Sequence, residues 1–295
     1  MVEYNTIILG AGISGISCAI YLKRAGISTL IIENGIPGGQ LNKATVIENY
    51  PGYVSIEGSE LAGNLLNQLE TSGVEILYDE ITYIDYDKKI VVVNDKEYGY
   101  SNLVFATGRR EKTLGIENED LLIGRGISLC ATCDGALYRD REVAVIGGGS
   151  SAVSEAIYLS NIVSKVYLIY RGNELRAEEV LKDKIKRIDN IEVMYEVNVS
   201  SYMIEDDKLV CISLDNGKNI KVDGVFLAIG YVPNSELFIG NKTDNYIEVD
   251  EYGETSISNV YACGDVINKG IYQLVTASSE GVLVASSIIR RNERK

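Results

Sequence analysis

A short apolar segment runs directly into a glycine turn near the start of the chain: Tyr4-Asn-Thr-Ile-Ile-Leu9, then Gly10-Ala-Gly12-Ile-Ser-Gly15. A helical pattern follows from Ile16 to Ala25, and Ser28 to Glu33 is a second apolar, strand-like run. Strand, glycine turn, helix and strand within about thirty residues make one parallel βαβ unit. Such a turn lets the backbone approach a pyrophosphate, and an acid at the position of Glu33 can bind a ribose hydroxyl. The alternative is a purely structural turn beside an exposed glutamate.

The same pattern returns more than a hundred residues later. Glu142 to Ile146 is strand-like, Gly147-Gly-Gly149-Ser-Ser-Ala152 is the turn, Val153 to Leu159 is helical and Lys165 to Tyr170 is the next strand. Gly147, Gly149 and Ala152 occupy the fingerprint positions. Two such units in one chain predict two nucleotide-binding domains.

Two apolar strands that run into glycine close these domains, at 103–108 and 224–230. The connectors that follow them are short and polar. We therefore predict an α/β protein of two Rossmann-like, three-layer domains, with the second inserted into the first. The expected boundaries are 1–112 with 233–295 for the first domain and 113–232 for the second.

The second fingerprint differs from the first where the nucleotide's ribose is recognised. Tyr170-Arg171-Gly172 and, further on, Arg176 follow its second strand, where an NADH site favours an acid. Arg171 and Arg176 favour a 2′-phosphate, although two arginines are a thin cluster. The alternative is a pair of solvated surface arginines.

The amino-acid composition excludes several kinds of partner and of catalytic chemistry. The 295 residues carry a formal net charge of −14 with no histidine, which disfavours nucleic-acid and acidic-membrane partners and removes histidine-based catalysis and histidine-ligated metals. The sequence pI is about 4.6. No apolar run approaches membrane-spanning length, and the turn that starts at Gly10 leaves no room for a cleavable signal segment. Five sparse cysteines fit a cytoplasmic protein with one reactive pair rather than a secreted disulfide scaffold.

That pair is Cys130-Ala-Thr-Cys133, followed directly by Asp134. The spacing suits a small, reducible disulfide. Half a zinc site is the structural alternative, but no second C-x-x-C and no histidine would complete it, so we predict no metal site. Asp134 is either an acid/base for the thiols or a turn-forming aspartate. Three further cysteines are expected to be buried bystanders, namely Cys18, Cys211 and Cys263.

Over essentially its whole length the chain resembles the low-molecular-weight thioredoxin reductases. The block Gly124-Arg-Gly-Ile-Ser-Leu-Cys-Ala-Thr-Cys-Asp-Gly135 is the most specific match. The other matching stretches are Gly10 to Gly15, Gly38 to Leu41, Glu48-Asn-Tyr-Pro-Gly52, Ala106-Thr-Gly108, Gly147 to Ala152 and Gly264-Asp265-Val266.

The resemblance implies FAD in the first domain and thioredoxin as the partner that receives electrons. It also implies a homodimer, and a domain rotation that presents the cysteine pair alternately to flavin and to thioredoxin. Reduced flavin would reduce the disulfide, and the dithiol would then reduce thioredoxin. By position, the implied FAD-binding residues are Gly10, Gly12, Ile13, Ser14, Gly15, Glu33, Gly39, Gln40, Leu41, Asn49, Thr107, Gly108, Gly264, Asp265, Val266, Tyr272 and Gln273.

Two departures from the family concern the electron donor. NADPH-using members carry His-Arg-Arg-x-x-x-Arg, of which this chain keeps Arg171 and Arg176, and their Arg-Gln pair near the flavin is here Tyr272-Gln273. A branch of the family takes electrons from reduced ferredoxin. These departures slightly favour ferredoxin as the electron donor. The intact second glycine turn is still compatible with NADPH.

Two other functions remain open from the sequence alone. One is an FAD-dependent dithiol oxidase that passes electrons to oxygen, and the other is a redox-sensing flavoprotein without turnover. An exchangeable C-x-x-C argues against the second. For the reductase we expect Cys133 to face the flavin and Cys130 to attack thioredoxin.

Overall fold

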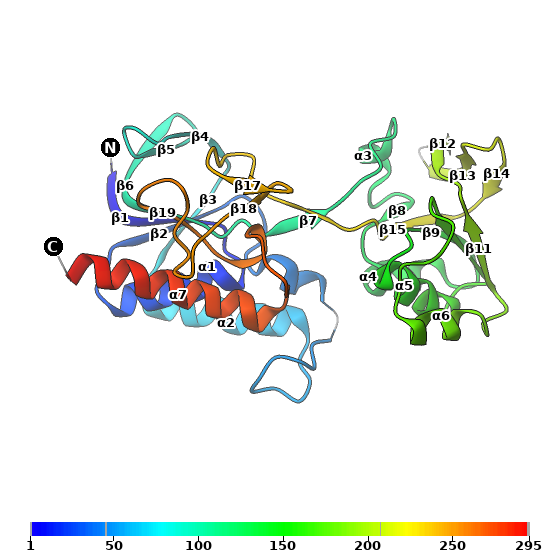
Figure 1. Ribbon diagram of the computed structural model, residues 1–295, viewed down its shortest axis with the longest axis horizontal. Helices are drawn as coiled ribbons and strands as arrows, with labels where there is room; N and C mark the ends of the chain where they lie inside the picture. The colour runs from blue at the N-terminus through cyan, green and yellow to red at the C-terminus, as the bar shows by residue number, and fades with distance from the viewer. Residues whose placement is uncertain (1, 45, 207, 294–295) are drawn as a thin grey trace. The chain divides into compact units, whose positions relative to one another are not determined.

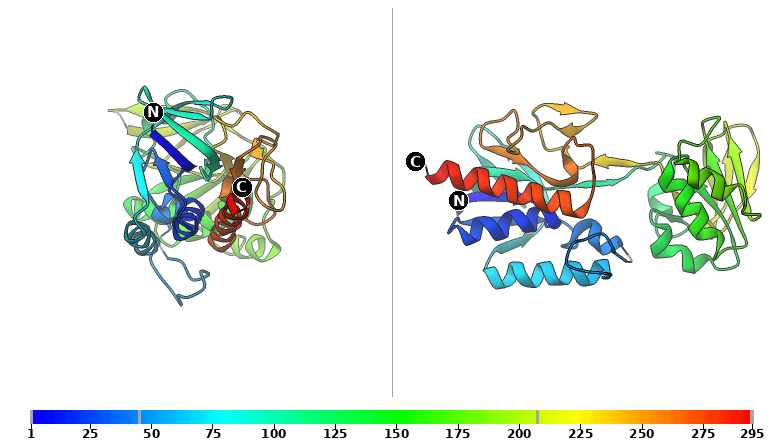
Figure 2. Two further views of the ribbon diagram at one scale, coloured as in Figure 1. Left: turned by 90° about the vertical axis from the view of Figure 1, so that its left-hand side faces the viewer. Right: turned by 60° about the horizontal axis from the view of Figure 1, so that its bottom comes forward.

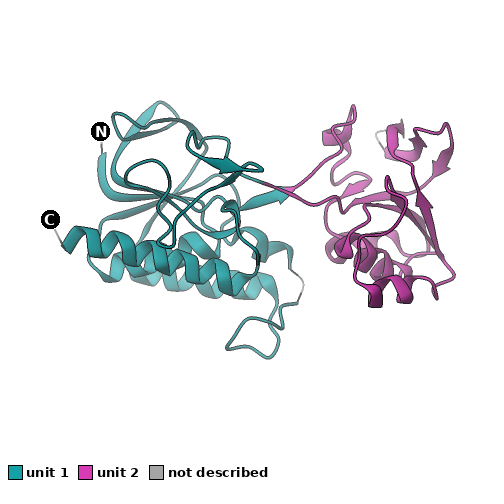
Figure 3. Cartoon of the chain, viewed as in Figure 1, with its two compact units in different colours: residues 1–110, 233–295 teal, residues 111–232 magenta. Residues whose placement is uncertain are grey.

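The structure is a computed structural model that describes residues 2–44, 46–206 and 208–293. The chain divides into two compact units, residues 1–110 with 233–295 and residues 111–232 (Figure 3). The first crossing follows Arg110 rather than residue 112, because the Lys112 N–H donates to the Gly230 carbonyl at 2.9 Å and so belongs with the second unit. The two crossings contain the strands β7 (Arg109–Glu111) and β16 (Tyr231–Pro233), which pair with each other.

Unit 1 is built on a sheet of order β3-β2-β1-β6-β5-β4, with β19 paired to β6. The pairs formed by β3, β2, β1, β6 and β19 are parallel, whereas β4, β5 and β6 form an antiparallel meander. The strands are β1 (Val2–Leu9), β2 (Thr29–Glu33), β3 (Glu75–Tyr78), β4 (Ile81–Asp85), β5 (Ile90–Val93), β6 (Lys96–Phe105), β17 (Lys242–Thr243), β18 (Tyr246–Ile247) and β19 (Val260–Ala262). The helices are α1 (Ile13–Arg24), α2 (Gly58–Ser72), α7 (Leu274–Glu293) and the short η1 (Gly39–Lys43) and η3 (Gly264–Val266).

Successive side chains of β1 point to opposite faces of the sheet, so the strand contributes to two hydrophobic cores. Ile8 packs with α1 and α7 on one face, while Ile7 and Leu9 pack on the other with residues such as Phe238. The long helices α1, α2 and α7 run alongside one another on the first face (Figures 1 and 2). Their close approach uses Gly281, where a Cβ would lie 2.1 Å from the Ser14 carbonyl oxygen. Within the described residues, no helix is long and apolar enough to cross a membrane.

Unit 2 repeats this plan in smaller form. Its parallel sheet has the order β11-β10-β9-β15-β8, and a separate antiparallel sheet has the order β12-β13-β14. The strands are β8 (Ile127–Ser128), β9 (Glu142–Ile146), β10 (Lys165–Tyr170), β11 (Ile191–Tyr195), β12 (Val199–Glu205), β13 (Lys208–Leu214), β14 (Asn219–Lys221) and β15 (Gly224–Leu227). The helices are α3 (Glu119–Leu122), α4 (Ala131–Asp134), α5 (Ser150–Ser160), α6 (Glu179–Ile185) and the short η2 (Gly135–Tyr138).

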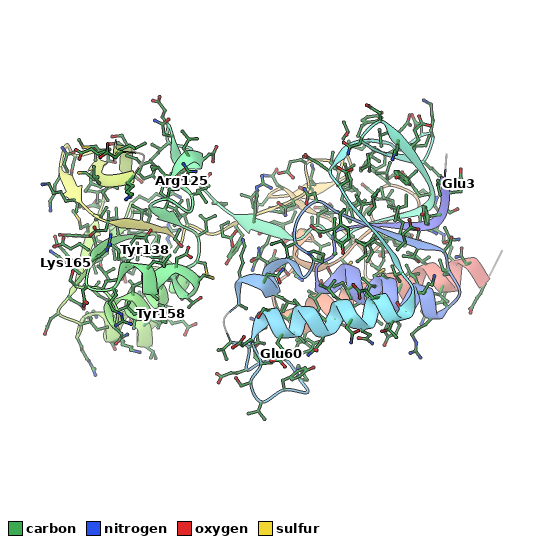
Figure 4. All side chains as sticks on the ribbon, turned by 180° about the vertical axis from the view of Figure 1, so that it is seen from behind. Glu3, Glu60, Arg125, Tyr138, Tyr158 and Lys165 are labelled. Atoms are coloured by element: carbon green, nitrogen blue, oxygen red, sulfur yellow. A yellow bond between two sulfur atoms is a disulfide. The ribbon has the colours of Figure 1, made fainter. Side chains whose placement is uncertain are left out.

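The parallel sheet of unit 2 is covered on both faces. Val143 and Val145 of β9 pack against α5, while Ala144 and Ile146 pack towards the antiparallel sheet. Tyr138, labelled in Figure 4, lies against Gly224, where a Cβ would meet its ring at 2.3 Å. Helices, parallel sheet and antiparallel sheet thus form three layers, which confirms the predicted α/β fold with two Rossmann-like domains.

Candidate functional site

The first glycine turn is shaped by close backbone contacts. Gly10 has φ +103°, and a Cβ there would lie 2.6 Å from the Ala106 carbonyl oxygen. A Cβ on Gly15 would lie 2.1 Å from the Gly10 carbonyl oxygen, which explains why the helix packs so closely on its strand. At Gly12, by contrast, a Cβ would meet no protein atom within 4 Å. The open side of the turn is therefore the side on which a pyrophosphate can approach the backbone.

Glu33 ends β2 beside this turn, as the sequence predicts. Its Oε2 accepts a hydrogen bond from the Ala11 N–H at 2.6 Å, and its Oε1 accepts one from the Gly35 N–H at 2.7 Å. Both bonds fix the carboxylate, and each oxygen keeps a lone pair that can accept from a hydroxyl. This geometry suits an acid that binds the ribose of a nucleotide.

A pocket of about 830 Å³ in unit 1 brings most of the predicted cofactor residues together. All of them line it except Gly15, Gly264 and Val266, which lie behind the wall as packing residues. At one end the Asn49 Nδ2 donates to the Gln273 Oε1 at 3.1 Å, which joins two segments far apart in sequence. Gln40 also belongs to this end, where its Nε2 donates to the Arg109 carbonyl at 2.9 Å.

Thr107 and Gly108 form a turn after β6 at the pocket wall. The Thr107 hydroxyl donates to the Asn234 carbonyl at 2.6 Å, and the Asn234 Nδ2 donates to the Thr107 carbonyl at 2.8 Å. Gly108 has φ +64°, a conformation that favours glycine. The two bonds hold this part of the wall in a fixed shape.

Arg109 is a wall residue that the sequence reasoning missed. Its Nε lies 3.2 Å from the Asp265 Oδ2, and its guanidinium carbon lies 4.2 Å from the centre of the Tyr272 ring. Asp265 also pairs with Lys269, which in turn binds Glu280 at 2.8 Å. Burial raises the pKa of the Tyr272 phenol, so the ring remains neutral under the stacked cation. Only the fold reveals this cluster, because Arg109 and Tyr272 are far apart in the chain.

The pocket fits FAD on structural grounds. It offers an open glycine turn at a helix start, a fixed acid at the ribose position and a polar far end that contains Gln40, Asn49 and Gln273. Its volume is typical of cofactor sites. These residues would hold the two ends of one long dinucleotide.

The cysteine pair forms a disulfide in unit 2, with the two Cα atoms 5.3 Å apart. Cys130 precedes the one-turn helix α4, and the Cys133 N–H points at the Cys130 Sγ at 3.2 Å. The buried Ser128 hydroxyl donates to the Asp134 carboxylate at 2.7 Å and accepts from the Cys130 N–H at 3.1 Å. Cys133 is exposed while Cys130 is half-buried, so a partner can reach the bridge. Ser128 is a second residue that the sequence reasoning missed.

The remaining cysteines lie where the sequence predicts, in the core. Cys18, Cys211 and Cys263 are all buried thiols. Burial raises the pKa of Cys18 well above its ordinary value and that of Cys263 to about 12. Thiols that stay protonated are poor nucleophiles.

The second glycine turn lines its own pocket, of about 620 Å³. Gly147 has φ +143°, and a Cβ there would lie 2.3 Å from the Ala228 carbonyl oxygen, whereas Gly149 is open on its outer side. Ala152 lies buried beneath the turn rather than in the pocket. The Tyr170 ring packs directly on Gly148, where a Cβ would meet it at 2.4 Å.

Both predicted arginines line this second pocket. Arg171 and Arg176 are exposed, and neither forms an ion pair with any described residue. The segment that carries them is tied to the turn, because the Arg176 N–H donates to the Gly148 carbonyl at 2.7 Å. The backbone of Arg176 is therefore held beside the glycine turn.

Glu155 is an acid in the second pocket that was not predicted. One of its carboxyl oxygens is buried and has no hydrogen-bond partner in the described part of the chain. Burial, with the negative charge of Glu111, raises the pKa of Glu155 to about 7. The signal available in the sequence was an acid on the helix that follows the glycine turn.

Two dinucleotide-binding folds and an exposed C-x-x-C disulfide next to an acid define a class of protein. This combination belongs to flavin- and pyridine-nucleotide-dependent disulfide oxidoreductases, in which a dinucleotide cofactor and a cysteine pair exchange electrons.

Comparison with known proteins gives the same class. Residues 4–281 match the family described as pyridine nucleotide-disulphide oxidoreductase. The chain is 37% identical to the thioredoxin reductase of Bacillus subtilis, over 97% of this chain and 93% of that protein. The structure matches that of the Lactococcus lactis thioredoxin reductase with a TM-score of 0.86 and 32% identity, over 99% of this chain and 100% of the other. It also matches a ferredoxin-flavin thioredoxin reductase from Clostridium acetobutylicum with a TM-score of 0.56 and 28% identity, over all of both chains.

The chain therefore belongs to the pyridine nucleotide-disulphide oxidoreductase family and, within it, to the low-molecular-weight thioredoxin reductases. The resemblance drawn from the motifs is confirmed.

Proposed function

We propose that this protein is a thioredoxin-disulfide reductase, in which electrons pass through FAD to the Cys130–Cys133 disulfide and from there to thioredoxin. FAD supplies two-electron chemistry between the donor and the disulfide. The observation that carries the proposal is the accessible disulfide beside a fixed acid, in a chain with a pocket that fits FAD. The names of the relatives in the same family point to the same substrate.

The local geometry supports a role for the two cysteines in the thiol chemistry. In the reduced pair, the Cys133 N–H that points at Cys130 Sγ would stabilise a thiolate on Cys130. That thiolate attacks one sulfur of the thioredoxin disulfide, and the other thioredoxin sulfur leaves as a thiolate. Cys133 then attacks Cys130 Sγ, which restores the C-x-x-C disulfide and releases the second thioredoxin thiol. Asp134 is placed to take up and return protons, and Ser128 orients it.

We propose NADPH as the electron donor, bound in the second pocket. Support comes from an open turn at Gly149 and from the exposed Arg171 and Arg176, which lack acidic partners among the described residues. An unpaired guanidinium beside a phosphate-binding turn is suited to a 2′-phosphate. We therefore place NADPH ahead of ferredoxin, although the departures from the family motif slightly favour ferredoxin.

Reduced ferredoxin is the second candidate donor. The observations in its favour are Tyr170 and Gly172, which stand at two positions of the phosphate clamp and carry no positive charge. The Tyr170 ring also packs on the glycine turn itself. The name of the ferredoxin-flavin thioredoxin reductase that matches this chain over its full length also supports this candidate.

Anaerobic titration of the purified flavoprotein tests the donor. Flavin absorbance is followed after separate additions of NADPH, NADH and reduced ferredoxin. Bleaching by micromolar NADPH supports the proposal, whereas reduction by ferredoxin alone would transfer the role to the second candidate. Fast reoxidation by oxygen, with dithiols consumed and no thioredoxin reduced, would identify a dithiol oxidase instead.

The arginines give this test a matched control. Arg171→Ala and Arg176→Ala each remove a charged phosphate contact worth about 1.5–3 kcal/mol, so the KM for NADPH should rise about tenfold to 150-fold. The KM for NADH should stay unchanged in both variants. Arg187→Ala removes an exposed arginine of the same unit that does not line the pocket. This variant should leave the KM for NADPH and the KM for NADH unchanged. Equal losses for NADPH and NADH in the two pocket variants would contradict a phosphate role.

Serine variants test the cysteine roles. Cys133→Ser should allow Cys130 to form a mixed disulfide with thioredoxin that cannot be resolved, and mass spectrometry would detect it. Cys130→Ser should trap far less. The reverse pattern would exchange the two roles while leaving the reductase proposal intact.

A homodimer is also proposed, and a cytoplasmic location remains a prediction from cysteine usage. Exposed Leu283 on α7 lines a surface hollow together with the exposed Tyr252, and this surface would suit contact with a second copy. Sedimentation velocity of the holoprotein distinguishes a dimer from a monomer directly.

A further inference from the structure

The polar end of the FAD pocket contains a cation whose role the proposed electron route does not specify. Arg109 begins β7, immediately after the turn at Gly108, and its side chain is only 19% exposed. It lines the same pocket wall as Asp265, Tyr272 and Gln273. Burial of this extent restricts a long side chain, so its position needs specific partners.

Arg109 has such partners in unit 1. The guanidinium pairs with Asp265 at 3.2 Å and stacks over the Tyr272 ring at 4.2 Å, while the Arg109 carbonyl accepts the Gln40 amide. Tyr272 is itself held in place, because its ring packs against Tyr246 with centroids 5.7 Å apart. The aromatic face and the carboxylate fix the guanidinium in two directions.

The charges form an alternating chain, Arg109, Asp265, Lys269 and Glu280, and only its first two members line the pocket. Asp265 is shared, with one oxygen near Arg109 and the other 3.2 Å from Lys269. Glu280 balances Lys269, so the four charges sum to zero. Arg109 is the positive end of this network, and it lies at the pocket wall.

We propose that Arg109, stacked on Tyr272 and anchored by Asp265, is the residue that stabilises negative charge on the isoalloxazine ring of bound FAD. A fixed cation near the ring favours electron-rich forms of the flavin, because protein charge near the ring nitrogens tunes its electronics. The inference rests on the proposed function, in that it assumes FAD in this pocket. It makes Arg109 a specific determinant of how readily the flavin accepts electrons.

Sulfite provides a test that does not depend on turnover. Sulfite adds to flavin N5 and leaves a negative charge on the ring, so its affinity reports the stabilisation of that charge. Arg109→Met keeps a side chain of similar length without the charge, and should weaken sulfite binding by about tenfold or more. Arg109→Lys should retain most of the affinity. Tyr272→Leu, which removes the stacking face, should cause a smaller loss in the same direction.

Arg24 supplies the control. It is an exposed arginine in the last turn of α1, in the same unit, and it does not line the pocket. Arg24→Met removes the same charge away from the pocket and should leave sulfite affinity unchanged. Sulfite affinity that is equal in Arg109→Met and the parent protein would overturn the inference, and so would equal losses in the Arg109 and Arg24 variants.

Flavin content separates this inference from the proposal on which it rests. If the parent protein takes up no FAD, the proposed function fails. The parent protein and all variants can instead bind FAD stoichiometrically while Arg109→Met changes neither the sulfite affinity nor the midpoint potential of the flavin. In that case only the role of Arg109 fails.

Discussion

Two glycines of the first turn should respond in opposite ways to the same substitution. Gly12→Ala adds a methyl group where no protein atom lies within 4 Å, at an ordinary φ of −75°. Gly15→Ala adds one 2.1 Å from the Gly10 carbonyl oxygen, which is backbone and cannot move aside cheaply. The first change places bulk where the pyrophosphate belongs, and the second disturbs the fold itself.

The magnitudes follow from these surroundings. In the cofactor-free protein, Gly12→Ala should change the free energy of unfolding by less than about 1 kcal/mol, because only a helix cap is altered. In the holoprotein the methyl group overpacks the cofactor, which costs about 1–3 kcal/mol and raises the FAD Kd about fivefold to 150-fold. Gly15→Ala should destabilise even the apoprotein by about 3 kcal/mol or more, since packed backbone must separate.

The assay combines two measurements on each variant. Titration of apoprotein with FAD, followed by flavin fluorescence, gives the Kd, and urea unfolding of the apoprotein gives the stability. An unchanged FAD Kd in Gly12→Ala would refute the placement of the pyrophosphate at this turn. Equal destabilisation of the apoprotein by both substitutions would refute the distinction between the open and the packed side.

Two further predictions concern unit 2. Burial and Glu111 raise the pKa of Glu155 to about 7 from 4.5, so the folded state prefers the protonated form and stability is lost as pH rises through this interval. Glu155→Gln should make stability less dependent on pH and raise the free energy of unfolding at about pH 8 by at most about 3 kcal/mol. Urea unfolding at two pH values measures this effect. A pH dependence of stability that is the same in the variant and the parent protein would contradict the prediction. Tyr202 donates to the buried Glu119 carboxylate at 2.8 Å, so Tyr202→Phe should lower stability by about 1.5–3 kcal/mol. Tyr167→Phe, which loses a similar bond of 2.9 Å to the more exposed Glu142, is the control and should cost less than about 1 kcal/mol; equal losses would show that burial does not set the difference.

Local patterns in the amino-acid sequence are enough to predict several parts of this protein. Glycine turns after apolar strands predict βαβ units because both the turn conformation and the strand–helix packing are set within about thirty residues. The Cys130–Cys133 spacing allows a disulfide without any distant contact, and the structure forms one. Glu33 could be predicted for the same reason, since its distance from the turn is fixed by one helix and one strand.

Contacts between segments that are distant in the sequence, by contrast, became visible in the folded chain alone. Arg109 is unremarkable in the sequence and becomes a pocket cation because the fold places Tyr272 and Asp265 against it. Ser128 acquires a role through its bond to Asp134, and Glu155 through burial beside Glu111. The lack of an acidic partner for Arg171 and Arg176 among the described residues also depends on the fold, because ion pairing depends on which acids lie nearby in space. Electrostatic environment and burial are properties of packing between segments, and a local sequence pattern does not contain them.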